Sequence, residues 1–116
     1  MPEFEFDNQQ MNNPVELALY LIGGKWKMPI LWRLNEGTRR FSELRRSLKR
    51  ITDRMLTRQL RELEAAGLIT RTVHPVVPPH VDYDITELGR TAIPSIKSLR
   101  AWGKSYLIAV DHPAAE

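Results

Sequence analysis

The spacing of apolar residues predicts helices along most of the chain and a pair of strands in its second half. From Thr52 to Gly67, the residues Leu56, Leu60 and Leu63 follow the i, i+4, i+7 rule of an amphipathic helix. At about 100° per residue, three arginines fall within roughly 40° of the direction opposite to these leucines. They are Arg54, Arg58 and Arg61. The pattern predicts a helix with a buried leucine face and an outward basic face, capped by its first and last residues.

Two more helices are predicted before this segment. Asn13 is a good N-cap, Pro14 suits the first helical position and Gly23 stops the helix, which predicts a helix over residues 14–22. A second helical pattern covers residues 25–36. The first helix is apolar on nearly every side, and such a helix must be covered all round. One small core can hardly provide that cover, so a partner subunit is the natural second surface.

Shorter elements complete the pattern. Residues 38–40 predict an extended piece, and residues 41–48 predict a short helix whose outer faces are mostly basic. After Gly67 the apolar residues alternate, which predicts a two-stranded hairpin around the tip "PVVPP". A long helical pattern returns after Thr86, and Pro94 should kink or divide it. The fold class that we expect is mainly α with a small β-hairpin wing, that is, α+β.

The same patterns set the expected domain limits. Residues 1–12 lack periodicity and are expected to form a flexible N-terminal tail, residues 13–110 a single domain, and residues 111–116 a frayed C-terminal tail. No apolar run is long enough to span a bilayer, and the acidic, polar N-terminus is unlike a signal peptide. We therefore expect a cytoplasmic protein that has no membrane partner.

Charge is distributed unevenly along the chain. The 116 residues carry a formal net charge of +3, yet residues 33–71 contain eleven basic and five acidic side chains, a local net charge of +6. Such asymmetry indicates a polyanionic partner, although arginines that only solubilise helix faces would give the same count. The chain contains no cysteine, which excludes disulfides, thiolate metal sites and thiol redox chemistry within it.

The order of the predicted elements is that of a winged helix-turn-helix. In that fold the second helix of the motif lies in the major groove of double-stranded DNA, and the first helix crosses the DNA backbone. The DNA-binding residues predicted on the second helix are Thr52, Arg54, Thr57, Arg58 and Arg61. The predicted phosphate contacts are Arg39, Arg40, Arg45, Arg46, Lys49 and Arg50. Which arginines meet bases and which meet phosphates stays open at this point.

The residues also resemble a known family. The segments "IGGKW", "LTRQLRELEAAGLI" and "VDYDITELG" together are similar to the HxlR-type winged helix-turn-helix transcriptional regulators, which are related to the MarR regulators. The resemblance covers residues 13–106 and implies a homodimer on a pseudo-palindromic operator, with the hairpin loop near the minor groove. It implies a dimer interface between the N- and C-terminal helices. The interface residues predicted there are Val15, Leu19, Ile96, Leu99, Trp102 and Tyr106.

Two positions depart from that family's pattern. Many members that sense electrophiles or oxidants carry a cysteine where this chain has Asn13, and asparagine caps a helix without redox chemistry. Thiol sensing is therefore excluded at this position. The wing tip has no arginine or lysine, which leaves His74 and His80 as its candidate phosphate contacts and weakens the case for minor-groove insertion.

Other kinds of function receive less support. His74, His80, Asp82 and Asp84 are metal-ligating residue types, but their spacing matches no common ligand pattern, and exposure on a hairpin is the better account. The "GGK" segment lacks the rest of a phosphate loop, and no catalytic motif accompanies it, so we expect neither an enzyme nor a cofactor. A winged-helix module that binds protein without specific DNA binding is the remaining alternative. A small-molecule effector, if one exists, would bind between the dimer helices and the DNA-binding lobe.

Overall fold

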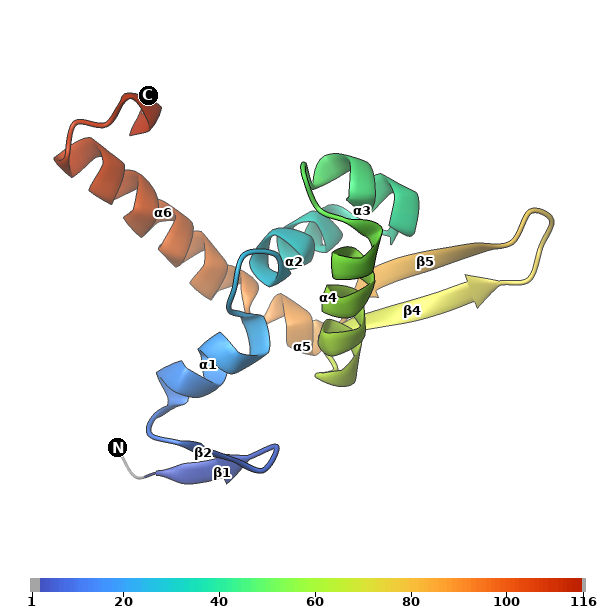
Figure 1. Ribbon diagram of the computed structural model, residues 1–116, viewed down its shortest axis with the longest axis horizontal. Helices are drawn as coiled ribbons and strands as arrows, with labels where there is room; N and C mark the ends of the chain where they lie inside the picture. Colours follow the sequence, from blue (N-terminus) through green and yellow to red (C-terminus); the bar gives the residue numbers. More distant parts are fainter. Residues whose placement is uncertain (1–2, 116) are drawn as a thin grey trace.

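The molecule has a helix-turn-helix core from which a hairpin extends on one side and a long C-terminal helix on the other (Figure 1). This computed structural model describes residues 3–115. Its elements in chain order are β1 (Phe4–Phe6), β2 (Gln9–Met11), α1 (Pro14–Ile22), α2 (Lys27–Glu36), β3 (Arg39–Arg40), α3 (Phe41–Ser47), α4 (Asp53–Ala65), β4 (Ile69–His74), β5 (His80–Ile85), α5 (Glu87–Arg90), α6 (Ile93–Ala109) and the 3-10 helix η1 (Pro113–Ala115). The predicted winged helix-turn-helix order is confirmed.

The core is formed mainly by one face of each of the helices α2, α3 and α4. The predicted inner face of α4 is confirmed, because Leu56, Leu60 and Leu63 are all buried. The largest fully buried side chains of the domain are Ile30, Leu31, Leu34, Leu44, Leu56, Leu60, Leu63 and Ile69. Each such side chain contributes roughly 1.5–3 kcal/mol when it leaves water. This packing fixes the rotation of α4 about its axis and therefore the direction of its outer face.

Three antiparallel strands form the wing in the order β3-β5-β4. The register pairs Ile69 with Ile85 at the base of the hairpin and His74 with His80 near its tip. Ile69, Ile85 and Tyr83 are buried, so the base of the wing is attached to the core. The outer half of the hairpin extends away from the helices (Figure 1).

The helix α1 begins and ends where the sequence predicts. The Oδ1 atom of Asn13 accepts hydrogen bonds from the backbone amides of Val15, at 2.9 Å, and Glu16, at 3.2 Å. These bonds satisfy two N–H groups that have no partner within the helix. The Glu16 carboxylate accepts from the Asn12 amide at 2.7 Å, one residue before the position that a capping box would use.

The N-terminal segment differs from the prediction. Residues 4–11, expected to lie in a flexible tail, form the β1–β2 hairpin, whose turn residues Asp7 and Asn8 have φ angles of 49° and 60°. Two-residue hairpin turns favour positive φ at both positions, and aspartate and asparagine tolerate it. The hairpin packs on α1, where the Tyr20 hydroxyl donates a hydrogen bond to the Asp7 carboxylate at 3.1 Å. The rings of Tyr20 and Phe6 pack in an edge-to-face arrangement. Part of the apolar surface of α1 is thus covered within the chain.

The C-terminal helical pattern is divided, as Pro94 predicts. The helix α5 ends at Arg90 and α6 starts at Ile93, which puts Pro94 in the first turn, where its missing N–H breaks no helical hydrogen bond. Within the segment expected to fray, Pro113–Ala115 form η1, and the Ala115 amide donates to the His112 carbonyl at 3.0 Å. Within residues 3–115, no helix combines the length and the apolar character needed to cross a membrane.

Candidate nucleic-acid interface

The helix α4 presents its arginines on the side opposite its buried leucines. Thr52 caps the helix, because its hydroxyl oxygen accepts a hydrogen bond from the Met55 amide at 3.0 Å. Arg54, Arg58 and Arg61 are all exposed, as the sequence predicts. Among residues 3–115, no carboxylate lies within ion-pair distance of Arg54 or Arg61. Their guanidinium groups are therefore free to meet phosphates or the acceptor edge of guanine.

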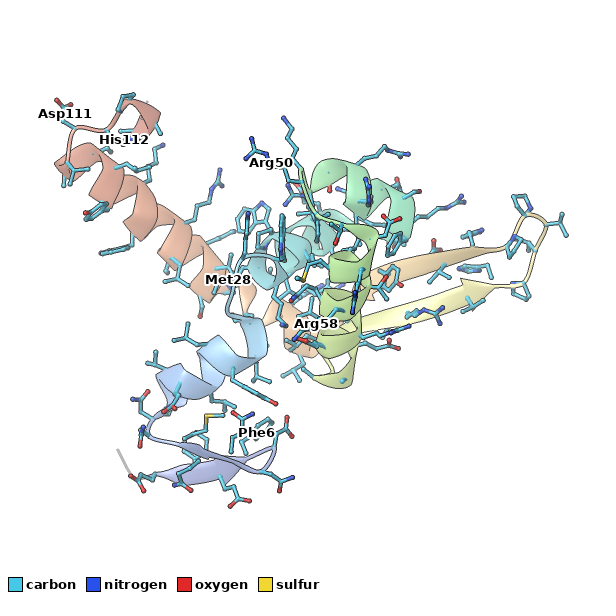
Figure 2. All side chains as sticks on the ribbon, in the orientation of Figure 1. Phe6, Met28, Arg50, Arg58, Asp111 and His112 are labelled. Atoms are coloured by element: carbon cyan, nitrogen blue, oxygen red, sulfur yellow. The ribbon has the colours of Figure 1, made fainter. Side chains whose placement is uncertain are left out.

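Arg58 differs because it shares a carboxylate with a second cation. The Glu62 carboxylate lies 3.5 Å from Arg58 Nε and 2.9 Å from Lys27 Nζ. The hydrogen bond from Lys27 holds the pKa of the Glu62 carboxyl below its ordinary value; partial burial opposes this shift, and Arg58 adds a smaller lowering. Lys27 is buried at the start of α2, so its contact with Glu62 joins α4 to α2. Arg58 is 71% exposed and its long contact is easily broken (Figure 2).

A cleft of about 510 Å³ lies between α4 and the wing. Its lining includes Thr57, Arg61, Glu64, Arg71 and Tyr83. Arg71 was not among the predicted site residues, but it pairs with Tyr83 in the register of β4 and β5, and paired residues share one face of a sheet. In the sequence, only the alternation of the strand indicates which way Arg71 points. Alternation does not show that the sheet face shared by Arg71 and Tyr83 lies beside α4.

Thr57 lies at the edge of the arginine face of α4. Its hydroxyl donates to the backbone carbonyl four residues earlier in the helix, at 2.8 Å. Because the donor is already used inside the helix, the methyl group and the oxygen lone pairs are what Thr57 can offer a partner. Thr57 is partly exposed and lines the cleft.

The basic residues at the end of α3 surround the start of α4. Arg45 forms an ion pair with Asp53, the first residue of α4, and so joins the two helices of the motif. Arg50 has a φ of 73° in the turn between these helices, and its side chain projects outward (Figure 2). Arg46 and Lys49 are exposed as well. The cations thus gather beside the N-terminus of α4, whose own amide groups attract anions.

The two arginines of β3 are held differently. The guanidinium group of Arg39 lies 3.4 Å from the Glu36 carboxylate, and its side chain is only partly exposed. The backbone amide of Arg40 donates to the Glu43 carboxylate at 2.8 Å, which fixes the first turn of α3 while the Arg40 side chain stays exposed. Arg40 therefore has the freer guanidinium group of the two.

The two predicted wing residues face each other across the hairpin. His74 and His80 form a cross-strand pair whose ring centroids lie 4.6 Å apart. A carboxylate oxygen of Asp82 lies 2.9 Å from His74 Nε2, and the other lies 3.8 Å from His80 Nε2. Asp84 is separate from this group, because it accepts a hydrogen bond from the Thr38 hydroxyl at the base of the wing. The structure thus joins three of the four metal-ligating residues noted in the sequence.

The helices α1 and α6 carry an exposed apolar surface, and five of the six predicted interface residues belong to it. Each of them is at least half exposed; they are Val15, Leu19, Leu99, Trp102 and Tyr106. Ile96 departs from the predicted interface set, because its side chain is only 7% exposed and belongs to the core of its own domain. It lies in the part of α6 that still packs on α2, whereas the rest of α6 projects outward (Figure 1).

Comparison with known proteins identifies the same architecture. A family model described as HxlR-like helix-turn-helix matches residues 21–111. An HTH-type transcriptional regulator of Methanothermobacter thermautotrophicus is 54% identical over 92 residues, which cover 79% of this chain and 70% of the relative. The HTH-type transcriptional regulator YdeP of Bacillus subtilis is 50% identical over 98 residues, which cover 84% and 77%. The redox regulator HypR in its reduced form has a TM-score of 0.80 and 46% identity, covering 85% of this chain and 98% of HypR.

The matched segment contains the helix-turn-helix, the wing and all of α6. It is the segment that holds both the basic face of α4 and the cations at the end of α3. The first two relatives are described as HTH-type transcriptional regulators, and HypR is described as a redox regulator. The chain therefore belongs to the HxlR-like family of helix-turn-helix transcriptional regulators.

Proposed function

We propose that the protein is a homodimeric regulator that binds a specific double-stranded operator through α4. The observation that carries this proposal is the exposed arginine face of α4, held opposite the buried Leu56, Leu60 and Leu63. A helix fixed in this way can enter the major groove and present its outer side chains to base edges. The proposed reading residues are Arg54, Arg58 and Arg61, with Thr52 and Thr57 beside them.

Sequence-independent contacts to phosphates would come from the cations around α4. The proposed contacts are Arg39, Arg40, Arg45, Arg46, Lys49 and Arg50. Such side chains release counterions when they meet phosphates, which supplies affinity but no sequence information. We add Arg71 to this set, because it lines the cleft between α4 and the wing together with Arg61. A DNA strand in this cleft would have a cation on both sides.

A second copy of the chain is the proposed cover for the apolar surface of α1 and α6. The helix α6 projects from the domain, and the exposed Leu99, Trp102 and Tyr106 would meet water in a monomer (Figure 1). A contiguous apolar surface of this kind marks an interaction site. A two-fold dimer would place two copies of α4 in successive major grooves, about one helical turn of DNA apart, which calls for a pseudo-palindromic operator.

We propose that this regulator works without a thiol switch. HypR is described as a redox regulator and is known in oxidised and reduced forms. This chain has no cysteine, and Asn13 caps α1 where the family resemblance places a cysteine in many redox-sensing members. Its signal must therefore use other chemistry.

An apolar cavity of about 450 Å³ is the proposed site for a small-molecule effector. It lies between α1, the start of α6 and the end of α4, and its lining includes Ala18, Leu21, Leu68, Leu88 and Ala92. A ligand there would touch both the proposed dimer helices and the DNA-binding lobe. An apolar fluorescent dye should bind the wild-type protein there and lose this binding in Ala18→Trp, which fills the cavity. Unchanged dye binding would contradict the assignment.

Selection of genomic fragments tests the proposed function against the alternative of a protein-binding module. The full chain is mixed with sheared genomic DNA, and the fragments that it retains are sequenced. We expect enrichment of a few fragments that share a pseudo-palindrome with half-sites about one helical turn apart. Retention of random fragments only, or of none, would favour the protein-binding module.

A further inference from the structure

Three metal-ligating side chains from two strands converge on one side of the wing. His74 ends β4, His80 begins β5, and Asp82 follows two residues later. Residues two apart in a strand share a face, and so do residues paired across two strands. The register pairs His74 with His80, so all three side chains lie on the same side of the hairpin. Their ligand atoms all lie within 4.8 Å of one another.

We propose that His74, His80 and Asp82 bind a divalent transition cation of the Zn²⁺ type. Zinc binds imidazole nitrogen and carboxylate oxygen at about 2.0–2.2 Å in tetrahedral geometry, which sets neighbouring ligand atoms roughly 3.3 Å apart. The Asp82 carboxylate lies 2.9 Å from His74 Nε2 and 3.8 Å from His80 Nε2, on either side of that value. Small side-chain rotations would bring all three ligands into coordination. Three protein ligands leave the fourth position for water or another small ligand.

An ion pair within the hairpin explains this cluster less completely. Asp82 is within hydrogen-bond distance of His74, but the 3.8 Å to His80 is too long for a hydrogen bond. The two imidazole rings nevertheless stack at 4.6 Å, with their Nε2 atoms both close to the same carboxylate. A cation bound by both Nε2 atoms and by the Asp82 carboxylate gives every one of these groups a partner.

The hairpin holds the ligands at a fixed separation before any ion arrives. The backbone pairing of His74 with His80 continues inward to the pair of Thr72 with Asp82. The tip between the histidines contains three prolines, and their restricted φ angles limit the freedom of the loop. The three ligand residues are half-buried, which shields the site and still leaves it accessible to an ion. Sequence spacing does not reveal the site, because its ligands meet only through the strand register.

A bound cation would change how the wing meets DNA. From His74 to Ile85 the chain carries Asp82 and Asp84 and no arginine or lysine, so this stretch by itself is acidic. A divalent ion reverses the local charge, and its open position can accept a phosphate oxygen. Zinc would therefore raise operator affinity. This coupling rests on the proposed function, whereas binding of the cation does not.

Zinc binding is measured first, on the full chain without DNA. Protein freed of metal by a chelator is titrated with Zn²⁺ in competition with a coloured chelator. We expect one ion per chain, with affinity at least roughly tenfold weaker in His74→Gln, His80→Gln and Asp82→Asn. His112→Gln is the matched control, because His112 lies beyond α6, far from the wing (Figure 2). Binding that all three variants retain, or that is lost with His112, would overturn the proposal.

A second readout distinguishes lost ligands from lost folding. In the wild-type protein, Zn²⁺ should shift the imidazole NMR signals of His74 and His80 and leave that of His112 unchanged. Equal effects on all three histidines would also overturn the site. Operator binding is then measured with and without Zn²⁺, and we expect about a tenfold gain from one added phosphate contact. If zinc binds but operator affinity does not change, the proposed effect of zinc on DNA binding is wrong. If the protein binds no DNA either with or without Zn²⁺, the proposed function alone is wrong.

Discussion

At the scale of single residues, the arginines of α4 differ in the ion pairs that they would have to break to bind DNA. Arg54 and Arg61 have no ion-pair partner among residues 3–115, whereas Arg58 shares Glu62 with Lys27. An exposed pair at 3.5 Å contributes little, so Arg58 can leave it at small cost. Glu62 then stays paired with Lys27 and keeps α4 attached to α2. Glu62 therefore anchors the helix more than it balances the charge of the arginines.

Replacement of Arg58 tests whether it reads a base. Arg58→Ala should weaken operator binding by about 1–3 kcal/mol, or roughly 5- to 150-fold, and should weaken random-duplex binding much less. Arg90→Ala removes the same charge at the end of α5 and serves as the control. Equal losses on both duplexes, measured by fluorescence anisotropy, would make Arg58 a phosphate contact. No loss on either would remove it from the interface.

The Lys27–Glu62 contact predicts a pH-dependent contribution to stability. Because folding lowers the pKa of Glu62, this contribution is present above the unfolded pKa and is lost as pH falls through the folded pKa. Glu62→Gln should lower the free energy of unfolding by about 1 kcal/mol at neutral pH, allowing for its partial exposure. Urea denaturation at several pH values should show this deficit shrinking below pH roughly 4. A deficit that stays constant with pH, or that Glu64→Gln reproduces, would contradict the assignment.

At the scale of elements, the sequence predicts those whose signals are local. The helices α1 and α4 carry their caps and apolar spacing within their own residues, and both were predicted correctly. The β1–β2 hairpin was not, because its strands have only three residues each and half of these six residues are polar. Its turn signal at Asp7 and Asn8 is present in the sequence, but the packing of Phe6 on Tyr20 that supports it is not local. The sequence named His74 and His80 as wing residues, but their close approach depends on the strand register and was not predicted.

The cap of α4 gives a prediction at this scale. Thr52→Ala removes the acceptor of the Met55 amide and should lower the free energy of unfolding by about 1 kcal/mol. Thr57→Ala is the matched control. The Thr57 hydroxyl donates to a carbonyl inside the same helix and does not cap it, and alanine has a higher helix propensity than threonine, so little stability should be lost. Denaturant titration should show the loss for Thr52→Ala only. If the two variants lose the same stability, the hydroxyl of Thr52 is not the cap.

At the scale of the whole molecule, two parts project from the helical core. The outer wing extends to one side, and α6 extends to the other with an apolar surface (Figure 1). Periodicity predicted that α6 is apolar but could not separate residues of the core from those of an interface. Ile96 belongs to the first group and Leu99 to the second, because their exposed fractions are 7% and 51%. In the proposed dimer, a second copy of the chain covers the apolar surface of α6. In the proposed complex, operator DNA lies beside the wing.

A charge placed on the apolar surface of α6 tests the dimer. Leu99→Glu should weaken self-association by roughly tenfold or more, because it buries a carboxylate in an apolar contact. Lys104→Glu introduces the same side chain on the opposite side of the helix and should leave association unchanged. Sedimentation of the wild-type protein and both variants measures the effect. A wild-type monomer, or equal behaviour of the two variants, would contradict the proposed dimer.

The central claim is that the cations around α4 bind double-stranded DNA. Its most direct test is titration of the protein with a duplex from upstream of its own gene at two salt concentrations, beside a random duplex of equal length. We expect tighter binding to the upstream duplex, and a loss of affinity of roughly tenfold or more between about 50 and 200 mM salt, because counterions are released from the phosphates. Absence of duplex binding, or binding that does not depend on salt, would contradict the claim.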